Sequence, residues 1–211
     1  MIHWLTKKLV FPPYHYAAPD GLLAVGGDLS VERLKLAYST GIFPWYNPED
    51  PILWWSPDPR FVLKPEELKV SRTMRQVLER NVFQITVNQA FEQVMRGCQA
   101  AKRDGQSGTW ISEEIIESYC KLHELGWASS IEAWQDGELV GGLYGVTIGR
   151  CFSGESMFAT KSNASKAAFI TYIRQIAQAG IELVDCQTRT PHLESLGGKF
   201  MPRKEFLTYL K

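Results

Sequence analysis

The sequence predicts an α+β fold: a small, loop-rich N-terminal domain over residues 1–60, then a mixed sheet flanked by helices over residues 61–211. Proline and glycine interrupt the first 60 residues so often that only one helix is predicted there. After residue 61, helical and alternating apolar patterns follow one another. The length of 211 residues fits one large domain, or a medium domain with a small appendage.

The single N-terminal helix is predicted to begin after Ser30, a candidate N-cap, and to stop at Gly41. Its apolar face is formed by Val31, Leu34, Ala37 and Tyr38. The preceding GGDLS sequence is interpreted as a turn entering this helix, because it lacks the lysine and glycine spacing of a phosphate-binding loop.

Three further helices are predicted before the sheet. The first follows Ser71, and its apolar and arginine side chains fall on opposite faces. A short strand or loop runs into the second helix within residues 85–99, and the third occupies residues 111–126. Between these two helices, KRDGQSGTW (102–110) is interpreted as a flexible, charged connection.

The sheet is predicted from three strands, a long helix and a returning strand. Asp136-Gly137 is a strong hairpin signal between the first two strands, and residues 150–158 form the third. The helix spans residues 165–180, and the strand over 181–188 can return beside the third strand as a crossover. Alternation then places Asp185 and Gln187 on one face of their strand, and Glu155 and Met157 on one face of theirs.

Composition excludes several classes of protein. The 23 Lys and Arg residues balance 23 Asp and Glu residues, which excludes a strongly basic coat for nucleic acid and a polyacidic tail. Hydrophobic residues make up 45% of the chain, which argues against disorder. No apolar run approaches the ~18 residues of a membrane span. Because Pro12 and Pro13 also interrupt the N-terminal apolar patch, we expect a cytoplasmic protein without a signal peptide.

The four cysteines and four histidines show no spacing typical of a metal site. Scattered cysteines without a Cys-x-x-Cys pair are expected to be reduced and mostly buried. We therefore expect neither a metal nor a cofactor. The unusual feature is the presence of seven tryptophans.

Distinctive sequences over residues 21–60, 108–115 and 154–188 resemble the leucyl/phenylalanyl-tRNA-protein transferase family, and the resemblance extends over nearly the whole chain. They include GLLAVGGDLS, GIFPWYNPEDPILWWSPDPR, GTWISEEI, GESMFATKSNASK and LVDCQT. The resemblance implies transfer of leucine or phenylalanine, and less readily methionine, from aminoacyl-tRNA to proteins with N-terminal Arg or Lys, which marks them for degradation through the N-degron pathway. It also implies a larger domain similar to the GNAT acetyltransferases. Nothing in the sequence requires more than a monomer.

The resemblance assigns Asp185, Gln187 and Glu155 to the catalytic centre. Gln187 would contact the attacking amine or the ester, Asp185 would orient and polarise it, and Glu155 would hold a cationic protein N-terminus. On physical grounds Asp185 is a possible proton acceptor, whereas neutral Gln187 can only hydrogen-bond. Without the resemblance, an Asp that caps the strand end and a solvent-exposed Gln would be the simpler interpretation.

Apolar residues of the sheet and of the long helix would form the pocket for the Leu or Phe side chain, although such residues are more often core. The candidates are Phe152, Met157, Phe169, Val184, Leu143, Tyr172 and Ile176. The resemblance assigns Trp45 and Trp110 to the 3′-terminal adenosine, where stacking contributes about 1–3 kcal/mol per base. Tyr38 and Tyr119 are further candidates there. We interpret Trp54 and Trp55 as packing between the domains.

The basic helix face of Arg72, Arg75 and Arg80 is the best candidate for contacting the tRNA backbone, since phosphate contacts supply non-specific affinity. Glu79 lies on the same face, so an ordinary solvated helix face is the alternative. Additional contacts could come from Lys7, Lys8, Lys102 and Arg103.

Two other functions remain open from the sequence. An acetyl-CoA-dependent acyltransferase would need a glycine-containing loop to cradle the pyrophosphate, but FATKSNASK stands in that place and has no glycine. A non-catalytic module that binds basic N-termini or tRNA is the second alternative. Retention of Asp185, Gln187 and Glu155 together argues against it.

Overall fold

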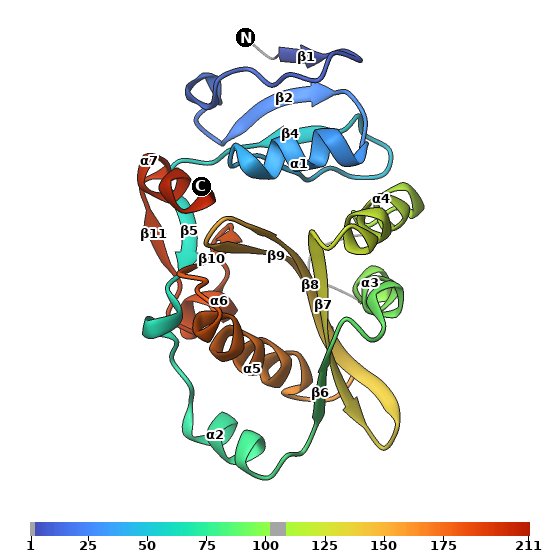
Figure 1. The fold of residues 1–211 in the computed structure, drawn as a ribbon, viewed down its shortest axis with the longest axis vertical. Helices are drawn as coiled ribbons and strands as arrows, with labels where there is room; N and C mark the ends of the chain where they lie inside the picture. Colours follow the sequence, from blue (N-terminus) through green and yellow to red (C-terminus); the bar gives the residue numbers. More distant parts are fainter. Residues whose placement is uncertain (1–2, 102–108) are drawn as a thin grey trace.

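Two sheets organise the chain in the computed structural model, which describes residues 3–101 and 109–211 (Figure 1). A four-stranded sheet has the order β1-β2-β4-β3, and a seven-stranded sheet has the order β11-β5-β10-β9-β8-β7-β6. The strands are β1 His3–Leu5, β2 Leu22–Gly26, β3 Phe43–Pro44, β4 Leu53–Trp55, β5 Arg60–Leu63, β6 Gln84–Val87, β7 Ala128–Gln135, β8 Glu138–Ile148, β9 Cys151–Ala159, β10 Leu183–Gln187 and β11 Lys199–Met201. The α-helices are α1 Val31–Ser39, α2 Arg72–Glu79, α3 Phe91–Ala100, α4 Glu113–Glu124, α5 Ala164–Gln178, α6 Pro191–Ser195 and α7 Arg203–Phe206.

The predicted α+β class is therefore confirmed. The predicted connection over 102–110 lies almost wholly outside the described residues, as do Lys102 and Arg103. No helix among the described residues combines the length and the apolar character needed to cross a membrane.

Serine caps begin three of the helices, at the predicted Ser30 and Ser71 and also at Ser112, for which no cap is predicted from the sequence. The Oγ atoms of Ser30, Ser71 and Ser112 each accept a hydrogen bond from a backbone N–H in the first turn of α1, α2 and α4. Gly41 follows α1 with φ +75°, a conformation that glycine adopts without steric cost. Local sequence thus sets where these helices begin and where α1 ends.

The larger sheet contains the predicted hairpin and crossover. Asp136 and Gly137 both have positive φ at the turn between β7 and β8, as a type I′ turn requires. Strands β9 and β10 are parallel and are joined through α5, whereas the other pairs of this sheet are antiparallel. The first strand of this sheet along the chain, β5, pairs with β10 and β11.

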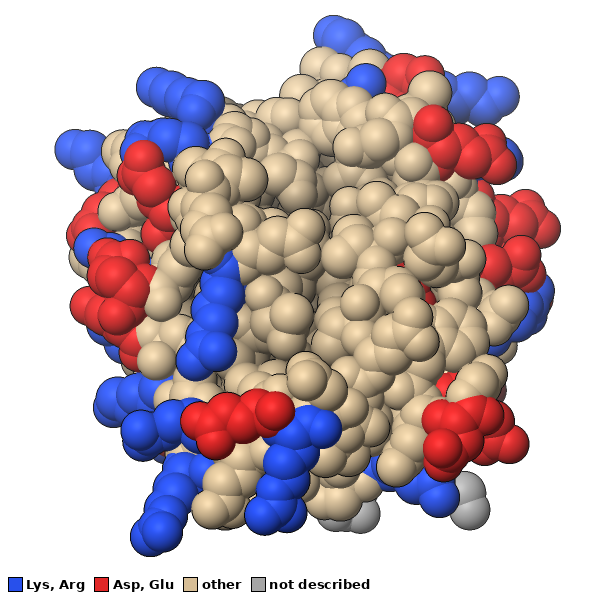
Figure 2. Space-filling view, turned by 60° about the horizontal axis from the view of Figure 1, so that its bottom comes forward, with Lys and Arg blue, Asp and Glu red and all other residues tan. Residues whose placement is uncertain are grey.

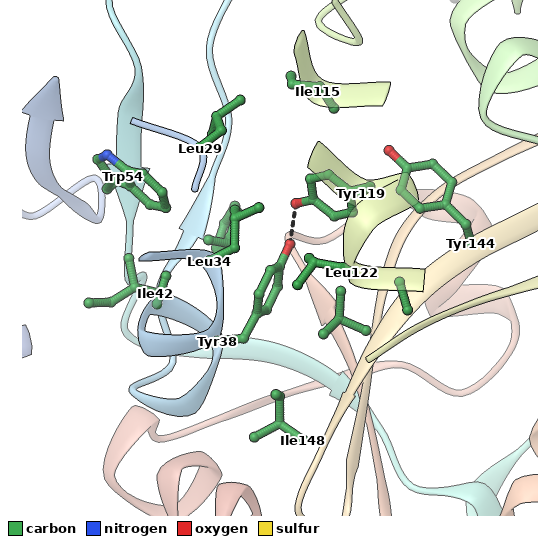
Figure 3. Packing of buried hydrophobic residues seen from close by; sticks show 14 of the residues in the cluster. Leu29, Leu34, Tyr38, Ile42, Trp54, Ile115, Tyr119, Leu122, Tyr144 and Ile148 are labelled. Carbon is green, nitrogen blue, oxygen red and sulfur yellow. Dashed lines mark hydrogen bonds between the residues drawn. The ribbon is translucent and has the colours of Figure 1, made fainter. Parts of the chain in front are cut away.

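Two buried clusters occupy the two faces of the larger sheet. One lies under α5 and includes Phe152, Phe169 and Val184. The other joins the N-terminal part to α3, α4 and β8, so that Leu34 and Trp54 share a core with Tyr144 (Figure 3). This shared core fixes the N-terminal part against one face of the larger sheet.

The alternation predicted for Glu155 and Met157 is wrong. The register between β8 and β9 shifts between Tyr144 and Gly145, which leaves an extra residue at this point of β9. Met157 consequently packs against the cluster under α5, whereas the carboxylate of Glu155 meets Tyr119 in the other cluster. A bulge reverses the face of every residue beyond it.

Candidate active site

A cavity of ≈ 440 Å³ opens where β9 and β10 stop pairing. The parallel pairing joins Leu183–Asp185 to Cys151–Ser153, and the residues beyond it on both strands line the cavity. The N-terminal part contributes a wall through β3 and the residue that follows it. The full lining is Phe43, Pro44, Trp45, Trp110, Leu143, Gly154, Glu155, Ser156, Met157, Phe169, Val184, Asp185, Cys186, Gln187, Thr188, Thr190, His192 and Leu193.

Glu155 and Gln187 form a hydrogen-bonded pair in this cavity. The Nε2 atom of Gln187 donates to Oε1 of Glu155 at 2.8 Å, and the Tyr119 hydroxyl donates to Oε2 at 3.4 Å. The pKa of Glu155 is raised to about 8, mainly by burial. The charge of Asp185 also raises this pKa, whereas hydrogen bonds from Tyr38 and Gln187 and the charge of Arg60 lower it.

The geometry leaves the carbonyl oxygen of the Gln187 amide as the acceptor available to a ligand, since its nitrogen already serves Glu155. The backbone at Gln187 has φ +62°, and the register with β5 shifts between Asp185 and Gln187. The strand is therefore bulged where the sequence predicts a regular alternation. Both side chains nevertheless line the cavity, as does Glu155.

Asp185 is completely buried, and its carboxylate accepts four hydrogen bonds. Arg60 donates to both oxygens at 2.8 and 2.7 Å. Ser153 Oγ donates to Oδ2 at 3.1 Å, and the backbone N–H of Gln187 donates to Oδ1 at 2.9 Å. Such a carboxylate is held in place and has little capacity left for a ligand.

The apolar candidates divide into two groups. Leu143, Met157, Phe169 and Val184 line the cavity, and we refer to them as its apolar wall. The remaining three candidates are absent from the lining and belong to the core under α5, where the rings of Phe152 and Tyr172 meet edge to face at 5.1 Å. These three are Phe152, Tyr172 and Ile176.

The aromatic candidates also divide. Trp45, which is 42% exposed, and buried Trp110 both line the cavity. Tyr38 and Tyr119 lie behind Glu155, where their hydroxyls share a hydrogen bond between α1 and α4 (Figure 3). Burial raises the pKa of both tyrosines well above the usual range, so both stay protonated near neutral pH. Their direct contact is therefore with Glu155 rather than with the cavity.

The two tryptophans of β4 support the aromatic wall from behind. Trp55 donates its indole N–H to the backbone oxygen of Trp45 at 2.6 Å, and the two rings lie 5.8 Å apart. Trp54 is fully buried against Phe11 and donates to the backbone oxygen of Gly26.

The two arginines of α2 and Arg80, which directly follows it, do not line the cavity. Arg72, Arg75 and Arg80 are exposed, while Met74 on the opposite side of the helix is buried. Seen from the end of the molecule that carries α2, Lys and Arg side chains are interspersed with Asp and Glu around a largely uncharged centre (Figure 2). This distribution agrees with the zero net charge of the sequence.

Arg60 and His192 are among the residues of the site that sequence reasoning missed. Arg60 lies at the end of a proline-rich sequence and carries no motif that indicates a partner 125 positions away. His192 lines the cavity, and its Nε2 atom has no hydrogen-bond partner within the part of the chain that the structure describes. Burial, together with the charge of Lys166, lowers the pKa of His192. Its position after β10, rather than a spacing motif, brings it to the cavity.

Among residues 3–101 and 109–211, no group of His, Cys, Asp and Glu side chains is arranged to hold a metal ion. The cysteines at 98, 151 and 186 are buried, and Cys120 is partly exposed. Burial raises the pKa of Cys186, the cysteine in the cavity lining, far above its usual range. That thiol is therefore protonated near neutral pH and a poor nucleophile.

Comparison with known proteins adds family evidence to this geometry. The family model for the leucyl/phenylalanyl-tRNA protein transferase matches residues 62–211, and the model for the N-terminal domain of the same family matches residues 27–58. A leucyl/phenylalanyl-tRNA–protein transferase of Nitrosospira multiformis is 56% identical over 100% of this chain and 91% of that protein. One from Flavobacterium johnsoniae is 53% identical over 100% of this chain and 99% of that protein.

Likeness to solved structures is more distant. A GCN5-related N-acetyltransferase from Kribbella flavida overlaps with a TM-score of 0.39 and 12% identity, over 79% of this chain and 58% of that one. L-PGS from Bacillus licheniformis overlaps with a TM-score of 0.43 and 13% identity, over 77% and 50%. These overlaps are too weak to bear on activity. The family models and the full-length relatives show that the chain belongs to the leucyl/phenylalanyl-tRNA protein transferase family.

Proposed function

We propose that this protein transfers leucine or phenylalanine, and less readily methionine, from aminoacyl-tRNA to the α-amine of proteins with N-terminal Arg or Lys. The product would be marked for degradation through the N-degron pathway. The observation that carries the proposal is a single cavity lined by the hydrogen-bonded pair of Glu155 and Gln187, by two tryptophans and by several apolar side chains. Family membership supports it.

The two walls fit the two ends of an aminoacyl-adenosine. Trp45 and Trp110 offer aromatic faces to the adenine, a contact that contributes about 1–3 kcal/mol per stacked base. The apolar wall receives the amino acid side chain, and the flexible thioether of Met157 suits several unbranched shapes. The ester between the two ends then lies beside the polar pair.

The reaction needs positioning more than activation, because the ester is already activated. The lone pair of the acceptor amine attacks the ester carbonyl carbon and forms the new C–N bond. Collapse of the tetrahedral intermediate breaks the bond to the ribose oxygen, which takes up the proton released by the amine. Gln187 accepts a hydrogen bond from the attacking amine through its amide oxygen. Ionised Glu155 receives the proton and returns it to the leaving oxygen.

Asp185 acts in this scheme by holding Gln187, since four donors occupy its carboxylate. Tyr38 and Tyr119 hold the other side of Glu155, with Tyr119 donating directly to the carboxylate. The catalytic roles thus separate into a proton acceptor, a hydrogen-bond acceptor and their supports.

We further propose that Arg72, Arg75 and Arg80 contact the tRNA backbone and that the protein acts as a monomer. Their exposure on α2 and the lack of acidic partners in hydrogen-bond contact with them support the first point within the described residues. The division at residue 60 is part of the same proposal, and the separate family models for 27–58 and 62–211 support it.

The test is transfer of labelled leucine from leucyl-tRNA to peptides that begin with Arg, Lys or Ala. We expect labelling of the first two peptides only, and near-complete loss with Asp185→Ala. Labelling that ignores the first residue would overturn the assignment of the acceptor. Binding of tRNA or peptide without any transfer would favour a binding module, and binding of acetyl-CoA in a calorimetric titration would favour an acetyltransferase.

A further inference from the structure

Arg60 is a buried cation at the back of the cavity, with 1% of its surface exposed. Its guanidinium donates from Nε and Nη2 to the two oxygens of Asp185, and from Nη1 to the backbone oxygen of Gly41 at 3.3 Å. A planar fork that serves both carboxylate oxygens fixes the rotation of that carboxylate as well as its position.

The guanidinium also lies between two aromatic rings from distant parts of the chain. Its carbon is 4.6 Å from the ring centre of Phe43 in β3 and 4.7 Å from that of Phe206 in α7. Phe43 lines the cavity, and Gly41 precedes it by two residues. Arg60 therefore joins the N-terminal wall, the C-terminal helix and the strand that carries Gln187.

This arrangement matters because Gln187 occupies an unfavourable backbone conformation. A non-glycine residue at φ +62° must be held by its surroundings. Its N–H donates to Oδ1 of Asp185, and that same oxygen accepts from Nε of Arg60. The Arg60 guanidinium and the backbone N–H of Gln187 are therefore linked through the carboxylate of Asp185.

We propose that Arg60 is a positioning residue for the transfer reaction, which holds Asp185 so that Gln187 and Glu155 keep their reactive arrangement. The inference rests on the proposed function. Arg60 touches no substrate in this scheme and acts through Asp185.

The charge of Arg60 also acts on Glu155. The groups that face Glu155 are Tyr38 from α1, Tyr119 from α4, Asp185 from β10 and Arg60 from β5. Arg60 lowers the pKa of Glu155, whereas Asp185 raises it. Loss of the cation removes the effect that lowers the pKa of Glu155, so Glu155 would retain its proton to higher pH.

Two variants of Arg60 distinguish the effect of its positive charge from that of its paired hydrogen bonds to Asp185. Arg60→Lys keeps the cation but cannot serve both oxygens, so we expect kcat to fall about 10-fold or more with an unchanged pH profile. Arg60→Met loses both features, so we expect kcat to fall about 100-fold or more and the acid limb of the profile to move to higher pH. The KM for aminoacyl-tRNA should change little in Arg60→Lys. An Arg60→Lys variant with wild-type kcat would overturn the inference.

Arg203→Lys is the matched control. Arg203 is also buried, lies over a ring, that of Tyr14, at 5.0 Å, and donates to the backbone oxygen of Ser56, but it does not line the cavity or contact Asp185. Its replacement should leave kcat unchanged. An equal loss of kcat in both variants would show a general structural effect and contradict the specific role of Arg60.

The double variant Arg60→Met/Asp185→Asn tests whether Arg60 works through Asp185, and it also avoids a lone buried charge. We expect its kcat to equal that of Asp185→Asn alone, because the two residues act as a unit. If the fold-loss of kcat in the double variant equals the product of the losses in the two single variants, the inference is overturned.

A measurement that needs no transfer keeps the two proposals distinguishable. The pKa of Glu155 in the folded state lies above its value in the unfolded chain. The contribution of Glu155 to stability is therefore complete below about pH 4.5 and is lost as the pH rises through about 8. In urea unfolding, Arg60→Met should extend this loss to higher pH, whereas Arg60→Lys should not. Absence of leucyl transfer by the wild type would refute the proposed function alone, while identical pH dependences of unfolding in all three proteins would refute the role of Arg60.

Discussion

Burial and hydrogen bonding set the protonation of Glu155, the side chain on which the proposed proton transfer depends. With a pKa of about 8, this carboxyl is largely protonated at neutral pH, and Gln187 and Tyr119 remain bonded to it. Ionisation of Glu155 as pH rises makes it a base without rearranging these neighbours. The cavity thus holds a titrating carboxyl close to the reaction.

We expect kcat of the wild type to rise with pH through about 8, because ionised Glu155 is the active form. Glu155→Gln should lower kcat about 100-fold or more and remove this limb from the pH–rate profile. The α-amine of the acceptor titrates near 7.7–8.0 as well, so only the difference between the two profiles is diagnostic.

Glu92→Gln is the control for that experiment, because Glu92 is an exposed partner of Arg96. Its profile should match the wild type. If kcat of Glu155→Gln still rises with pH as in the wild type, that rise belongs to the acceptor amine, which would contradict a role for Glu155 as the base.

Trp45→Ala should raise the KM for aminoacyl-tRNA about 5- to 100-fold, since it removes one stacking face from the cavity. Trp45→Phe should recover part of the affinity. Trp4→Ala is the control, because Trp4 is 70% exposed and lies outside the cavity lining. Steady-state kinetics with varied leucyl-tRNA measures the effect, and an unchanged KM would remove Trp45 from the donor site.

The sequence identified Glu155, Asp185 and Gln187 through a resemblance, and the structure places all three at one cavity. It could not identify Arg60, because pairing across 125 positions leaves no local pattern. It also could not separate Leu143 from Phe152, since both are apolar residues of the sheet and only the cavity tells them apart.

At the scale of elements, local signals and long-range pairing differ in how well they can be predicted. The helix starts at Ser30 and Ser71 and the Asp136-Gly137 turn depend on local sequence, and the structure contains all of them. The bulges in β9 and β10 depend on register with neighbouring strands. They escaped prediction for that reason, and one of them reversed the face expected for Met157 relative to Glu155.

The bulge in β9 requires close approach at Gly145. A Cβ atom there would lie 2.2 Å from the backbone oxygen of Ser153 and 2.5 Å from the ring of Phe152. Gly145→Ala should therefore lower the free energy of unfolding by about 1–3 kcal/mol. Urea unfolding measures the change.

Gly154→Ala is the matched control from the neighbouring strand, because its Cβ would meet nothing closer than 3.9 Å. We expect its free energy of unfolding to stay within about 0.5 kcal/mol of the wild type. Equal destabilisation by both variants would show that the close approach at Gly145 is not the cause.

At the scale of the whole molecule, zero net charge shapes how a polyanion is bound. Charges of both signs are interspersed on the face in Figure 2, so long-range attraction is weak and binding depends on local contacts. A protein that coats nucleic acid needs a strongly basic surface, whereas a protein that binds only the end of a strand can rely on a few local contacts.

Replacement of Arg72, Arg75 and Arg80 together by Gln should raise the KM for aminoacyl-tRNA and reduce the salt dependence of log KM by about 2–3 in slope. The KM for a minimal aminoacyl-adenosine donor should not change. Arg96→Gln is the control, because Arg96 is already paired with Glu92 and Glu113. An unchanged salt slope in the triple variant would place the tRNA on another face.

The shared construction of the cavity has a consequence for how such proteins diverge. Phe43, Pro44 and Trp45 line the cavity from the N-terminal part, and most of the other lining residues lie between residues 143 and 193. A substitution in either part of this lining that alters its shape must be accommodated by the other, so the two parts are expected to be inherited together. A chimera that takes residues 1–60 from a relative would therefore keep full activity only when the facing residues of β9 and β10 come from the same parent.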